Sequence, residues 1–254
     1  MTDLPLPEAA ARVADLIRRS RTIVVFTGAG VSTESGIPDF RSPGGIWDRF
    51  DPAEFTFQRF MASEEVRKKS WSMIKEMVAI QARPNAAHLA IARLHEADKL
   101  DCVITQNIDG LHQEAGVPEE KVIELHGTAR WVRCFRCEAR FPAAEIHRRL
   151  HAGEEAPYCE RCGGILKPCT ISFGQPMPVR ETLEAERRSR QSDLFIVIGS
   201  SLVVYPAAQM PAYAVESGAK LVIVNMTPTN LDRYAVVLMR ERAGVAMAAI
   251  VARL

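Results

Sequence analysis

The sequence lacks any long hydrophobic run. Its longest apolar stretches are about the length of a β-strand, far short of the ~20 residues that a helix needs to cross a bilayer. The segment 1–21 is amphipathic and has no apolar stretch of the kind found in secretion signals. We therefore expect a cytoplasmic protein that has no membrane partner.

An excess of charge of one sign is also lacking, because 32 lysines and arginines stand against 31 aspartates and glutamates, for a net charge of +1. Such a balance gives no electrostatic reason to expect a direct nucleic-acid partner. Hydrophobic residues make up 47% of the chain and charged residues 25%, which is typical of a globular protein with a sizeable core. At 254 residues the chain suits one large domain, or one domain with a small insertion.

Buried parallel strands are predicted at four short apolar runs, because these runs do not alternate with polar residues. Helical patterns lie between them, and strands that alternate with helices indicate βαβ units. The predicted fold class is therefore α/β, with a Rossmann-like doubly wound parallel sheet. The expected strands are residues 23–27, 102–105, 194–199 and 221–225, and the expected helices are residues 7–19, 64–81, 86–97 and 205–217.

Two segments interrupt this alternation. Residues 46–84 carry several aromatic side chains and are expected to form a mainly helical excursion. Residues 130–167 are rich in cysteine, arginine and glycine, which indicates an insertion with its own means of stabilisation. We expect a Rossmann-like domain built from residues 1–129 and 168–254, with a small zinc-ribbon domain of residues 130–167 inserted into it.

The six cysteines are poor candidates for disulfides if the protein is cytoplasmic, because that compartment is reducing. Four of them form two Cys-x2-Cys pairs, Cys134 with Cys137 and Cys159 with Cys162. This spacing supplies four thiolates on two tight turns, which suits tetrahedral Zn²⁺. Four cysteine ligands leave no open coordination position, so the zinc is expected to be structural. The alternative is a pair of redox-active or metal-free turns.

Polar or glycine-rich loops follow three of the four predicted strands, and Asn225 follows the fourth. Ligands bind at the carboxyl ends of the strands in such sheets, so these loops are expected to face one crevice. Gly28 and Gly30 would let backbone N–H groups approach a pyrophosphate, and Ser200 offers a hydroxyl. However, Thr33 stands where the dinucleotide fingerprint has its third glycine. No acidic residue clearly ends the second strand, so hydride-transfer enzymes are disfavoured.

His126 is the best candidate for a general base among the six histidines, because it precedes a glycine and follows a short apolar run. The other five lie in helical or polar settings that favour structural or solvated roles. Asn107 and Asp109 follow the second predicted strand, where they fit either a turn or a functional site. Asp39 and Arg41 fit an ion pair within the loop after the first strand as well as a role in binding.

Taken together, these motifs resemble those of a sirtuin, one of the NAD-dependent protein lysine deacylases, of bacterial type. The resemblance spans nearly the whole chain and keeps the order of the family's motifs. It is carried most specifically by GAGVSTESGIPDFR at 28–41 and TQNIDGLH at 105–112. The other matching segments are PNAAH at 84–88, HG at 126–127, the four cysteines, KPCTISFG at 167–174, GSSL at 199–202 and VNMTPTNLD at 224–232.

The resemblance implies NAD as a co-substrate and one structural zinc ion per chain. It also implies that the glycine loop holds the pyrophosphate, and that residues after the second strand hold the nicotinamide ribose. His126 would be the general base, with Asn107 and Asp109 as further catalytic residues. Residues Ile171, Phe173 and Gly174 would pair with the substrate peptide as an added strand. The implied NAD contacts are Gly28, Ala29, Gly30, Ser32, Asp39, Phe40, Arg41, Gln106, Asn107, Ile108, Asp109, Gly199, Ser200, Ser201 and Asn225.

The implied activity is removal of an acyl group, above all acetyl, from protein lysines, with formation of nicotinamide, 2′-O-acyl-ADP-ribose and free lysine. The expected partners are acylated-lysine proteins, and the enzyme is expected to be a monomer. One alternative is mono-ADP-ribosyl transfer to proteins at the same NAD site, and another is an NAD-sensing interaction module without turnover. Intact His126 and Asn107 favour deacylation over both.

The chain departs from the family's usual pattern at two places. Gln175 stands where the family has glutamate, and Thr170 and Ser172 replace apolar residues that are common just before it. Desuccinylating sirtuins carry a Tyr-x-x-Arg pair on the helix after the cofactor loop, whereas this chain has Ile74 and Met77 at those places. A succinyl group is therefore disfavoured as a substrate.

Overall fold

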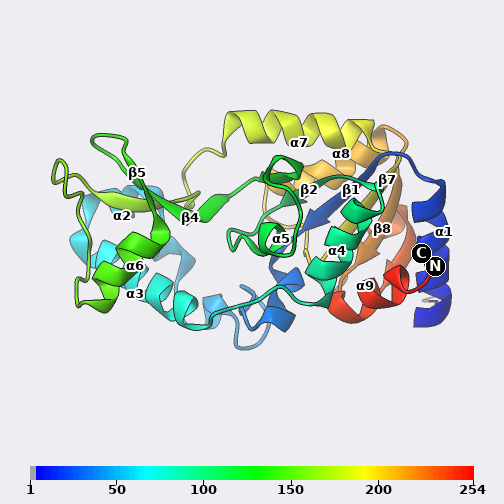
Figure 1. The fold of residues 1–254 in the computed structure, drawn as a ribbon, viewed down its shortest axis with the longest axis horizontal. Helices are drawn as coiled ribbons and strands as arrows, with labels where there is room; N and C mark the ends of the chain where they lie inside the picture. Colours follow the sequence, from blue (N-terminus) through cyan, green and yellow to red (C-terminus); the bar gives the residue numbers. More distant parts are fainter. Residues whose placement is uncertain (1–3) are drawn as a thin grey trace.

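A computed structural model describes residues 4–254 of the chain. The protein contains two β-sheets, a large one and a small one, which lie toward opposite ends of the molecule (Figure 1). The expected segment 1–129 begins with three residues that lie outside this described part. Within residues 4–254, no helix is both long enough and apolar enough to cross a membrane.

The large sheet has six parallel strands in the order β3-β2-β1-β7-β8-β9. The chain starts in the middle at β1, adds two strands on one side, and then crosses over to add three on the other. The order therefore reverses between β1 and β7, which is the point where doubly wound sheets bind ligands. The strands are β1 (Ile23–Thr27), β2 (Leu100–Thr105), β3 (Val122–Glu124), β7 (Leu194–Ile198), β8 (Lys220–Val224) and β9 (Ala235–Met239).

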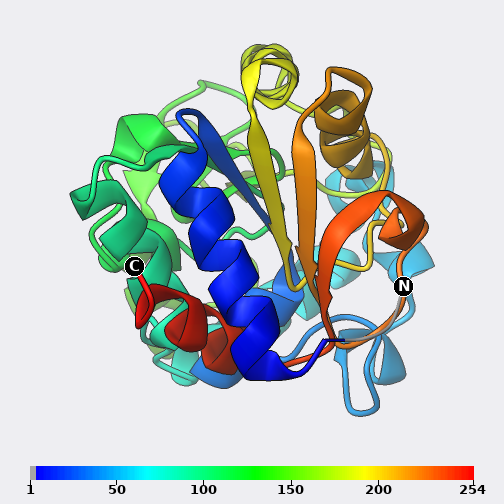
Figure 2. The same ribbon diagram turned by 90° about the vertical axis from the view of Figure 1, so that its right-hand side faces the viewer.

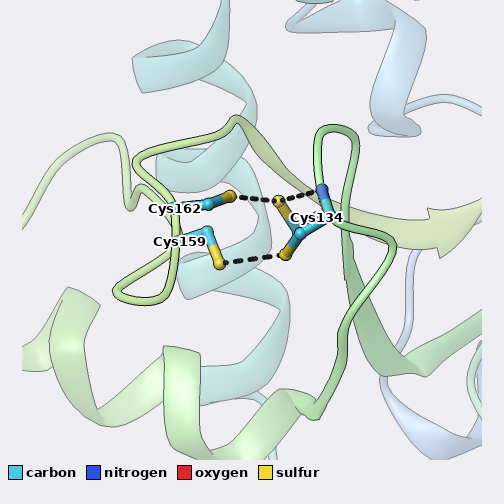
Figure 3. A group of neighbouring side chains, drawn as sticks. Cys134, Cys159 and Cys162 are labelled. Atoms are coloured by element: carbon cyan, nitrogen blue, oxygen red, sulfur yellow. Dashed lines mark hydrogen bonds between the residues drawn. The ribbon is translucent and has the colours of Figure 1, made fainter.

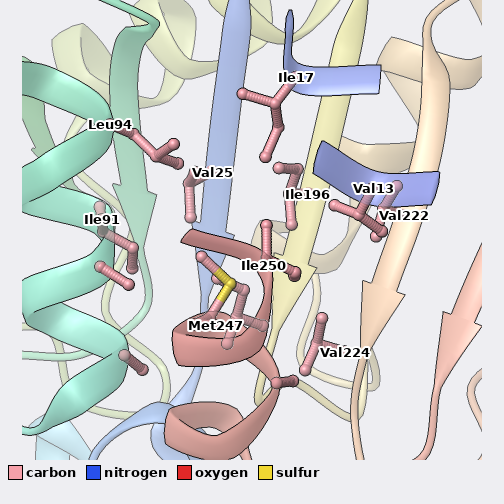
Figure 4. Packing of buried hydrophobic residues seen from close by; sticks show 14 of the residues in the cluster. Val13, Ile17, Val25, Ile91, Leu94, Ile196, Val222, Val224, Met247 and Ile250 are labelled. Carbon is pink, nitrogen blue, oxygen red and sulfur yellow. The ribbon is translucent and has the colours of Figure 1, made fainter. Parts of the chain in front are cut away.

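Helices cover both faces of this sheet (Figure 2). On one face, α1, α4 and α9 bring Ile17, Leu94 and Met247 against Val25 and Ile196 of the sheet (Figure 4). On the other face, α7 and α8 cover the alternate residues of the same strands. Since both faces are buried, the strands read as continuous apolar runs. These helices are α1 (Leu6–Arg19), α4 (Ala86–Glu96), α7 (Val179–Gln191), α8 (Met210–Glu216) and α9 (Ala243–Val251).

The small sheet is antiparallel, with the strand order β5-β4-β6. Three helices surround it at the far end of the molecule (Figure 1), and Trp71, Val132, Ile146 and Leu166 form their shared core. The excursion 46–84 therefore packs against the cysteine-rich segment. The elements are β4 (Gly127–Cys134), β5 (Arg140–Pro142), β6 (Leu166–Thr170), α2 (Phe57–Ala62), α3 (Glu64–Ala79) and α6 (Ala143–His151).

The predicted α/β, doubly wound fold is confirmed. The four predicted strands are the four central ones, β2, β1, β7 and β8, with ends within two residues of those expected. The outer strands β3 and β9 and the helices α7 and α9 were not predicted. The helix expected at 205–217 is shorter, because α8 starts at Met210 after a 3₁₀ turn, Ala207–Gln209. The division into domains at residues 129 and 168 stays a prediction.

Candidate functional site

The loops after β1 and β7 contact each other backbone to backbone at the point where the strand order reverses. The N–H of Gly30 donates to the Gly199 carbonyl at 2.9 Å. A Cβ atom on Gly28 would lie 2.8 Å from that same carbonyl oxygen. Gly199 itself has a φ of +63°, and a Cβ there would lie 2.3 Å from the Val31 nitrogen. Glycine is therefore needed at this contact, and the two loops present main chain rather than side chains to a ligand.

The loop after β2 joins the other two through side-chain hydrogen bonds. The Gln106 amide donates to the hydroxyl of Ser200 at 2.8 Å. The Asn107 amide donates to Ser32 at 3.0 Å, and the Ser32 hydroxyl donates to the Asp109 carboxylate at 2.8 Å. The loop after β2 thus bonds through Gln106 to the loop after β7 and through Asn107 and Asp109 to the loop after β1. The convergence expected from the sequence is present for these three loops.

The start of α4 holds the loop after β1 in place. Asn85 caps this helix by accepting the Ala87 N–H through its side-chain oxygen. Its amide nitrogen meanwhile donates to the carbonyl of Val31 at 2.8 Å and to the hydroxyl of Ser35 at 2.9 Å. An asparagine is a good N-cap, and here the same side chain also ties the helix to the loop. The PNAAH motif therefore supports the site without being part of it.

His126 lies directly before β4 and is half buried. Its Nδ1 lies 2.9 Å from the Gln106 carbonyl oxygen, which can only accept, so Nδ1 carries the proton and Nε2 keeps a free lone pair. Burial lowers the pKa of His126, although the Gln106 contact acts in the opposite direction. The imidazole is therefore neutral near pH 7, as a general base must be.

The residue after His126 fixes where the chain goes next. Gly127 has a φ of +70°, and a Cβ there would lie 2.0 Å from the Cys169 carbonyl oxygen. The His126 carbonyl in turn accepts the Ile171 N–H at 2.8 Å. The histidine and the segment after β6 are therefore held together by main-chain contacts on both sides of Gly127.

The segment that follows β6 is an exposed edge with a free hydrogen-bonding group. Phe173 pairs with Thr56 as an isolated parallel bridge, and its carbonyl accepts the Phe57 N–H at 2.9 Å. Within residues 4–254, no hydrogen bond uses the Ile171 carbonyl, whereas the Phe173 N–H faces Phe55 in the bridge with Thr56. Gln175 closes the segment with a turn, since its N–H donates to the Ser172 carbonyl at 3.0 Å.

Three aromatic rings connect this edge to the loop after β1. The Phe40 and Trp47 ring centroids lie 5.1 Å apart, and Trp47 and Phe173 lie 6.0 Å apart. Phe40 and Phe173 are both exposed. The Trp47 side chain therefore stands between an expected nicotinamide contact and an expected peptide contact.

The four cysteines of the two Cys-x2-Cys pairs come together beside β4 (Figure 3). Their sulfur atoms all lie within 4.8 Å of one another, with Cys134 and Cys162 at 3.5 Å and Cys137 and Cys159 at 3.7 Å. A Zn–S distance of about 2.3 Å places tetrahedral sulfur atoms roughly 3.8 Å apart, so the cluster fits one zinc ion. Thiolate ligands only, and no open position, make this a structural centre.

The glycine loop, the strand ends, the histidine and the cysteine cluster together match a known family. The model of the Sir2 family matches residues 28–206. The chain belongs to the Sir2 family. This confirms the sirtuin resemblance read from the motifs.

Relatives in the Sir2 family match over almost the full chain. An NAD-dependent protein deacetylase of Thermodesulfovibrio yellowstonii is 45% identical over 244 residues, which covers 95% of this chain and 94% of that protein. A structure described as the basis for the mechanism and regulation of Sir2 enzymes superposes with a TM-score of 0.89 at 40% identity and covers 97% of both chains. A structure described as Sir2, a p53 peptide and NAD⁺ superposes at 0.83, with 39% identity and 95% of both chains covered.

Two residues expected to contact NAD in this Sir2 chain bind within their own loops. The Asp39 carboxylate accepts the N–H groups of Arg41 and Ser42, at 2.9 and 2.7 Å, so it shapes the loop rather than pairing with the Arg41 guanidinium. The Asn225 amide donates to the Thr227 carbonyl at 2.8 Å. Roles of Asp39 and Asn225 in NAD binding stay predictions. Of the other expected contacts, Ala29 and Ser201 are half buried, while Phe40, Arg41 and Ile108 are exposed.

Sequence reasoning missed a buried polar group beneath the Sir2 site. Thr27 ends β1 and Thr105 ends β2, and their hydroxyls lie 2.8 Å apart. The Thr27 hydroxyl also contacts the His112 Nε2 at 2.9 Å, and the Thr105 hydroxyl accepts the Asn107 N–H at 3.0 Å. Burial lowers the pKa of His112 to about 3, so this imidazole is neutral. The one available signal was a threonine at each strand end, which a strand also favours for other reasons.

Proposed function

We propose that this protein is an NAD-dependent protein lysine deacylase, with acetyl-lysine as its main substrate. The products are nicotinamide, 2′-O-acyl-ADP-ribose and free lysine. The observation that carries the proposal is the connected group of Ser32, Asn107 and Asp109 beside a neutral His126 whose Nε2 is free. Sir2 relatives named as NAD-dependent protein deacetylases, matched over 94% of their length, support it.

NAD binding uses the main chain at one end and side chains at the other. Gly28, Gly30 and Gly199 let the two loops cross in close contact, and their own N–H groups donate to main-chain carbonyls. The Ala29 N–H has no acceptor among residues 4–254 and is left for a pyrophosphate. Ser32, Asn107 and Asp109 supply the hydroxyl, amide and carboxylate that a ribose and a carboxamide need as partners. We assign the nicotinamide half to this end and the adenosine half to Ser200 and Asn225.

His126 serves the acyl-transfer stage of the reaction. The acyl-lysine oxygen attacks the ribose carbon as nicotinamide leaves, and a ribose hydroxyl must then lose a proton so that it can attack the acyl carbon. The Nε2 of His126 accepts that proton, directly or through the neighbouring hydroxyl, because Nδ1 already donates to Gln106. Holding the two substrates in contact accounts for much of the rate, as a proximity effect.

The substrate peptide binds as an added strand along the segment after β6. The Ile171 carbonyl has no partner among residues 4–254, so it offers the backbone of a peptide strand an acceptor. Gly174, with φ of +77°, turns the chain away at the end of this edge. Backbone pairing of this kind is tolerant of peptide sequence, so Thr170 and Ser172 do not impede it.

Acetyl and longer neutral acyl groups are preferred over succinyl. Ile74 packs against the core around Trp71, and Met77 is half buried, so neither place offers a cation to a carboxylate. Lys75 lies between them, but its ammonium donates to the Leu150 carbonyl at 3.3 Å. Without a cation in the acyl site, a succinyl carboxylate would be desolvated without a partner.

The zinc ion holds the fold of the cysteine-rich segment and takes no part in the chemistry. We place the enzyme in the cytoplasm as a monomer, with no direct nucleic-acid or membrane partner. Light scattering after gel filtration measures the oligomeric state, and a stable dimer would contradict that part of the proposal.

The decisive experiment is incubation with NAD and a panel of acetyl-, myristoyl- and succinyl-lysine peptides, with product masses as the readout. We expect nicotinamide and O-acyl-ADP-ribose with the neutral acyl groups. A protein that becomes ADP-ribosylated instead would identify a mono-ADP-ribosyltransferase. NAD binding without any turnover would identify an NAD-sensing module, and either result would reject the deacylase.

A further inference from the structure

Lys167 is a lysine in β6 that is almost completely buried, with 2% of its surface exposed. Its ammonium donates to the carbonyl of Thr170 at 2.5 Å, and the Pro168 carbonyl lies 3.4 Å away. Among the described residues, no carboxylate lies within 4.0 Å of it. The centroid of the Phe60 ring lies 6.0 Å from Nζ.

This environment is unusual for a lysine, because buried cations are ordinarily paired with an acid. Among residues 4–254, its hydrogen bonds go only to main-chain carbonyls of the same strand, and burial lowers the pKa of the ammonium to about 8. A leucine or methionine would fill the same space without the free-energy cost of burying a charged group. The retained cation therefore calls for a role outside the stability of the core.

The acceptor of this hydrogen bond lies at the start of the exposed edge. Thr170 directly precedes Ile171, whose N–H is held by His126. The other end of the edge is held by Phe57, the first residue of α2, through the Phe173 carbonyl. Phe60, on the same helix, covers the Lys167 ammonium. Lys167 is thus a residue of β6 whose ammonium lies against Phe60 of α2. The ammonium donates to Thr170, the last residue of β6, where the exposed edge begins.

We propose that Lys167 is a positioning residue for the acyl-lysine peptide. Its ammonium holds the Thr170 carbonyl and so orients the next residue, Ile171, whose free carbonyl pairs with the substrate backbone. Lys167 acts through the edge and does not touch the substrate. This inference rests on the proposed peptide site, and it concerns peptide binding and not NAD binding.

Other charged and titratable groups near Lys167 are few. Cys169, on the same strand, acts to raise the pKa of the Lys167 ammonium and so opposes the effect of burial. Arg133, the register partner on β4, pairs with Glu138, and Arg67 on α3 donates to the Phe60 and Met61 carbonyls of α2. Loss of the Lys167 proton is therefore the expected alkaline event at this edge.

The test compares Lys167→Met and Lys167→Arg with the unmodified enzyme, by steady-state kinetics with the acetyl-lysine peptide and NAD varied separately. Lys167→Met should raise the KM for peptide about tenfold, while kcat and the KM for NAD change less than about twofold. Lys167→Arg keeps a donor and a permanent charge, so it should restore the peptide KM to within about threefold.

The pH profile separates positioning from packing. In the unmodified enzyme, the KM for a peptide with no titratable groups should rise between about pH 7 and 9.5, as Lys167 loses its proton. The Lys167→Arg variant should show a flat profile over the same range. An unchanged peptide KM in Lys167→Met, or the same alkaline rise in Lys167→Arg, would overturn the inference. If Lys167→Met does not fold, the pH dependence of the peptide KM in Lys167→Arg alone decides whether Lys167 positions the peptide.

Failure of the deacylase proposal would give a different result from failure of the Lys167 inference. The unmodified protein would then show no NAD-dependent product, whatever residue stands at 167. The affinity for a fluorescent acetyl-lysine peptide, measured by anisotropy, would still test Lys167: a loss of about tenfold in Lys167→Met supports the inference, and equal affinities reject it.

Discussion

Gln106 serves two parts of the site at once. Its side-chain amide donates to Ser200 at 2.8 Å, while its main-chain carbonyl sets the tautomer of His126. One residue therefore couples the adenosine side of the crevice to the base. The carbonyl contact survives any substitution at this position, so its loss cannot be tested there, whereas the histidine can be replaced directly.

His126→Ala should lower kcat for acetyl-lysine peptide by about 100-fold or more, the usual contribution of a general base. Exchange of labelled nicotinamide into NAD should persist, because that step precedes the proton transfer. In the unmodified enzyme, burial lowers the pKa of His126 from 6.5, so the base stays neutral until the pH falls below that value. The acidic limb of kcat/KM should therefore lie below pH 6.5.

The matched control is His151→Ala, since His151 is exposed at the end of α6. It should leave kcat and the pH profile unchanged. Full activity in His126→Ala would remove this residue from the mechanism.

Gly199 offers a test of the main-chain contact between loops. Gly199→Ala adds a Cβ 2.3 Å from the Val31 nitrogen at a φ of +63°, so it should destabilise the protein by roughly 3 kcal/mol and raise the KM for NAD. Gly218→Ala is the control, because Gly218 also has a positive φ, +93°, but nothing lies within 4 Å of its Cβ position. It should cost only about 1 kcal/mol and leave the KM for NAD unchanged. Equal losses in the free energy of unfolding of the two variants, measured by urea denaturation, would show that steric contact between the loops is unimportant.

The strands that could be predicted from the sequence are those whose two faces are both buried. β1 was predicted at its observed ends because each of its five residues is buried and apolar or threonine. α7 was missed because it is strongly polar and buries only Ala185 and Ser189. α9 was missed for the opposite reason, since Ala243–Val251 is apolar nearly all round and has no helical stripe to detect. A hydrophobic pattern reveals a helix when one face is buried and the other is not. α7 buries too few residues for such a pattern, and α9 is apolar on nearly every side.

The residues of the site also fall into those that the sequence reveals and those that it does not. Glycines and the two cysteine pairs have chemistry that is visible in the sequence, because few other residues can replace them. The linkage of Thr27 with Thr105, or the burial of Lys167, depends on which strands become neighbours. Adjacency of β1 and β2 is a product of the whole fold, so no local pattern contains it. Family resemblance supplied the roles of Ser32 and Asp109 that composition could not.

The contact between α2 and the exposed edge can be tested by one pair of substitutions. Phe57 is the first residue of α2, where proline is well tolerated, and Thr56 before it has an extended conformation that proline accepts. Phe57→Pro removes the N–H that holds the Phe173 carbonyl, and we expect the KM for peptide to rise about fivefold. Phe57→Ala loses the same contact with the Phe135 ring but keeps the N–H.

If the hydrogen bond matters, Phe57→Ala should keep a peptide KM close to that of the unmodified enzyme. Equal KM values in the two variants would mean that the ring, and not the main chain, supports the edge. The KM for NAD serves as the internal reference, because Phe57 lies on α2, away from the strand ends proposed to bind NAD.

For the whole molecule, the zinc ion determines whether the small sheet persists. Removal with a chelator should unfold the part of the chain that includes β5 and α6, seen as a partial loss of far-UV circular dichroism, and should abolish activity with it. Addition of Zn²⁺ should restore both signals together, and elemental analysis should find one zinc per chain. Loss of activity with an unchanged spectrum would instead assign the metal a catalytic role.

The two ends of the molecule meet only through a few connections, and the crossing at Gly127 is one of them. A side chain there has no space, and the histidine and the peptide edge flank it on the same piece of backbone. A mutational library aimed at new acyl substrates should therefore leave 126–127 and 169–171 untouched, since a change at either place displaces the base and the substrate together. Met77, on a separate helix, is a position where substitutions should leave the catalytic geometry undisturbed.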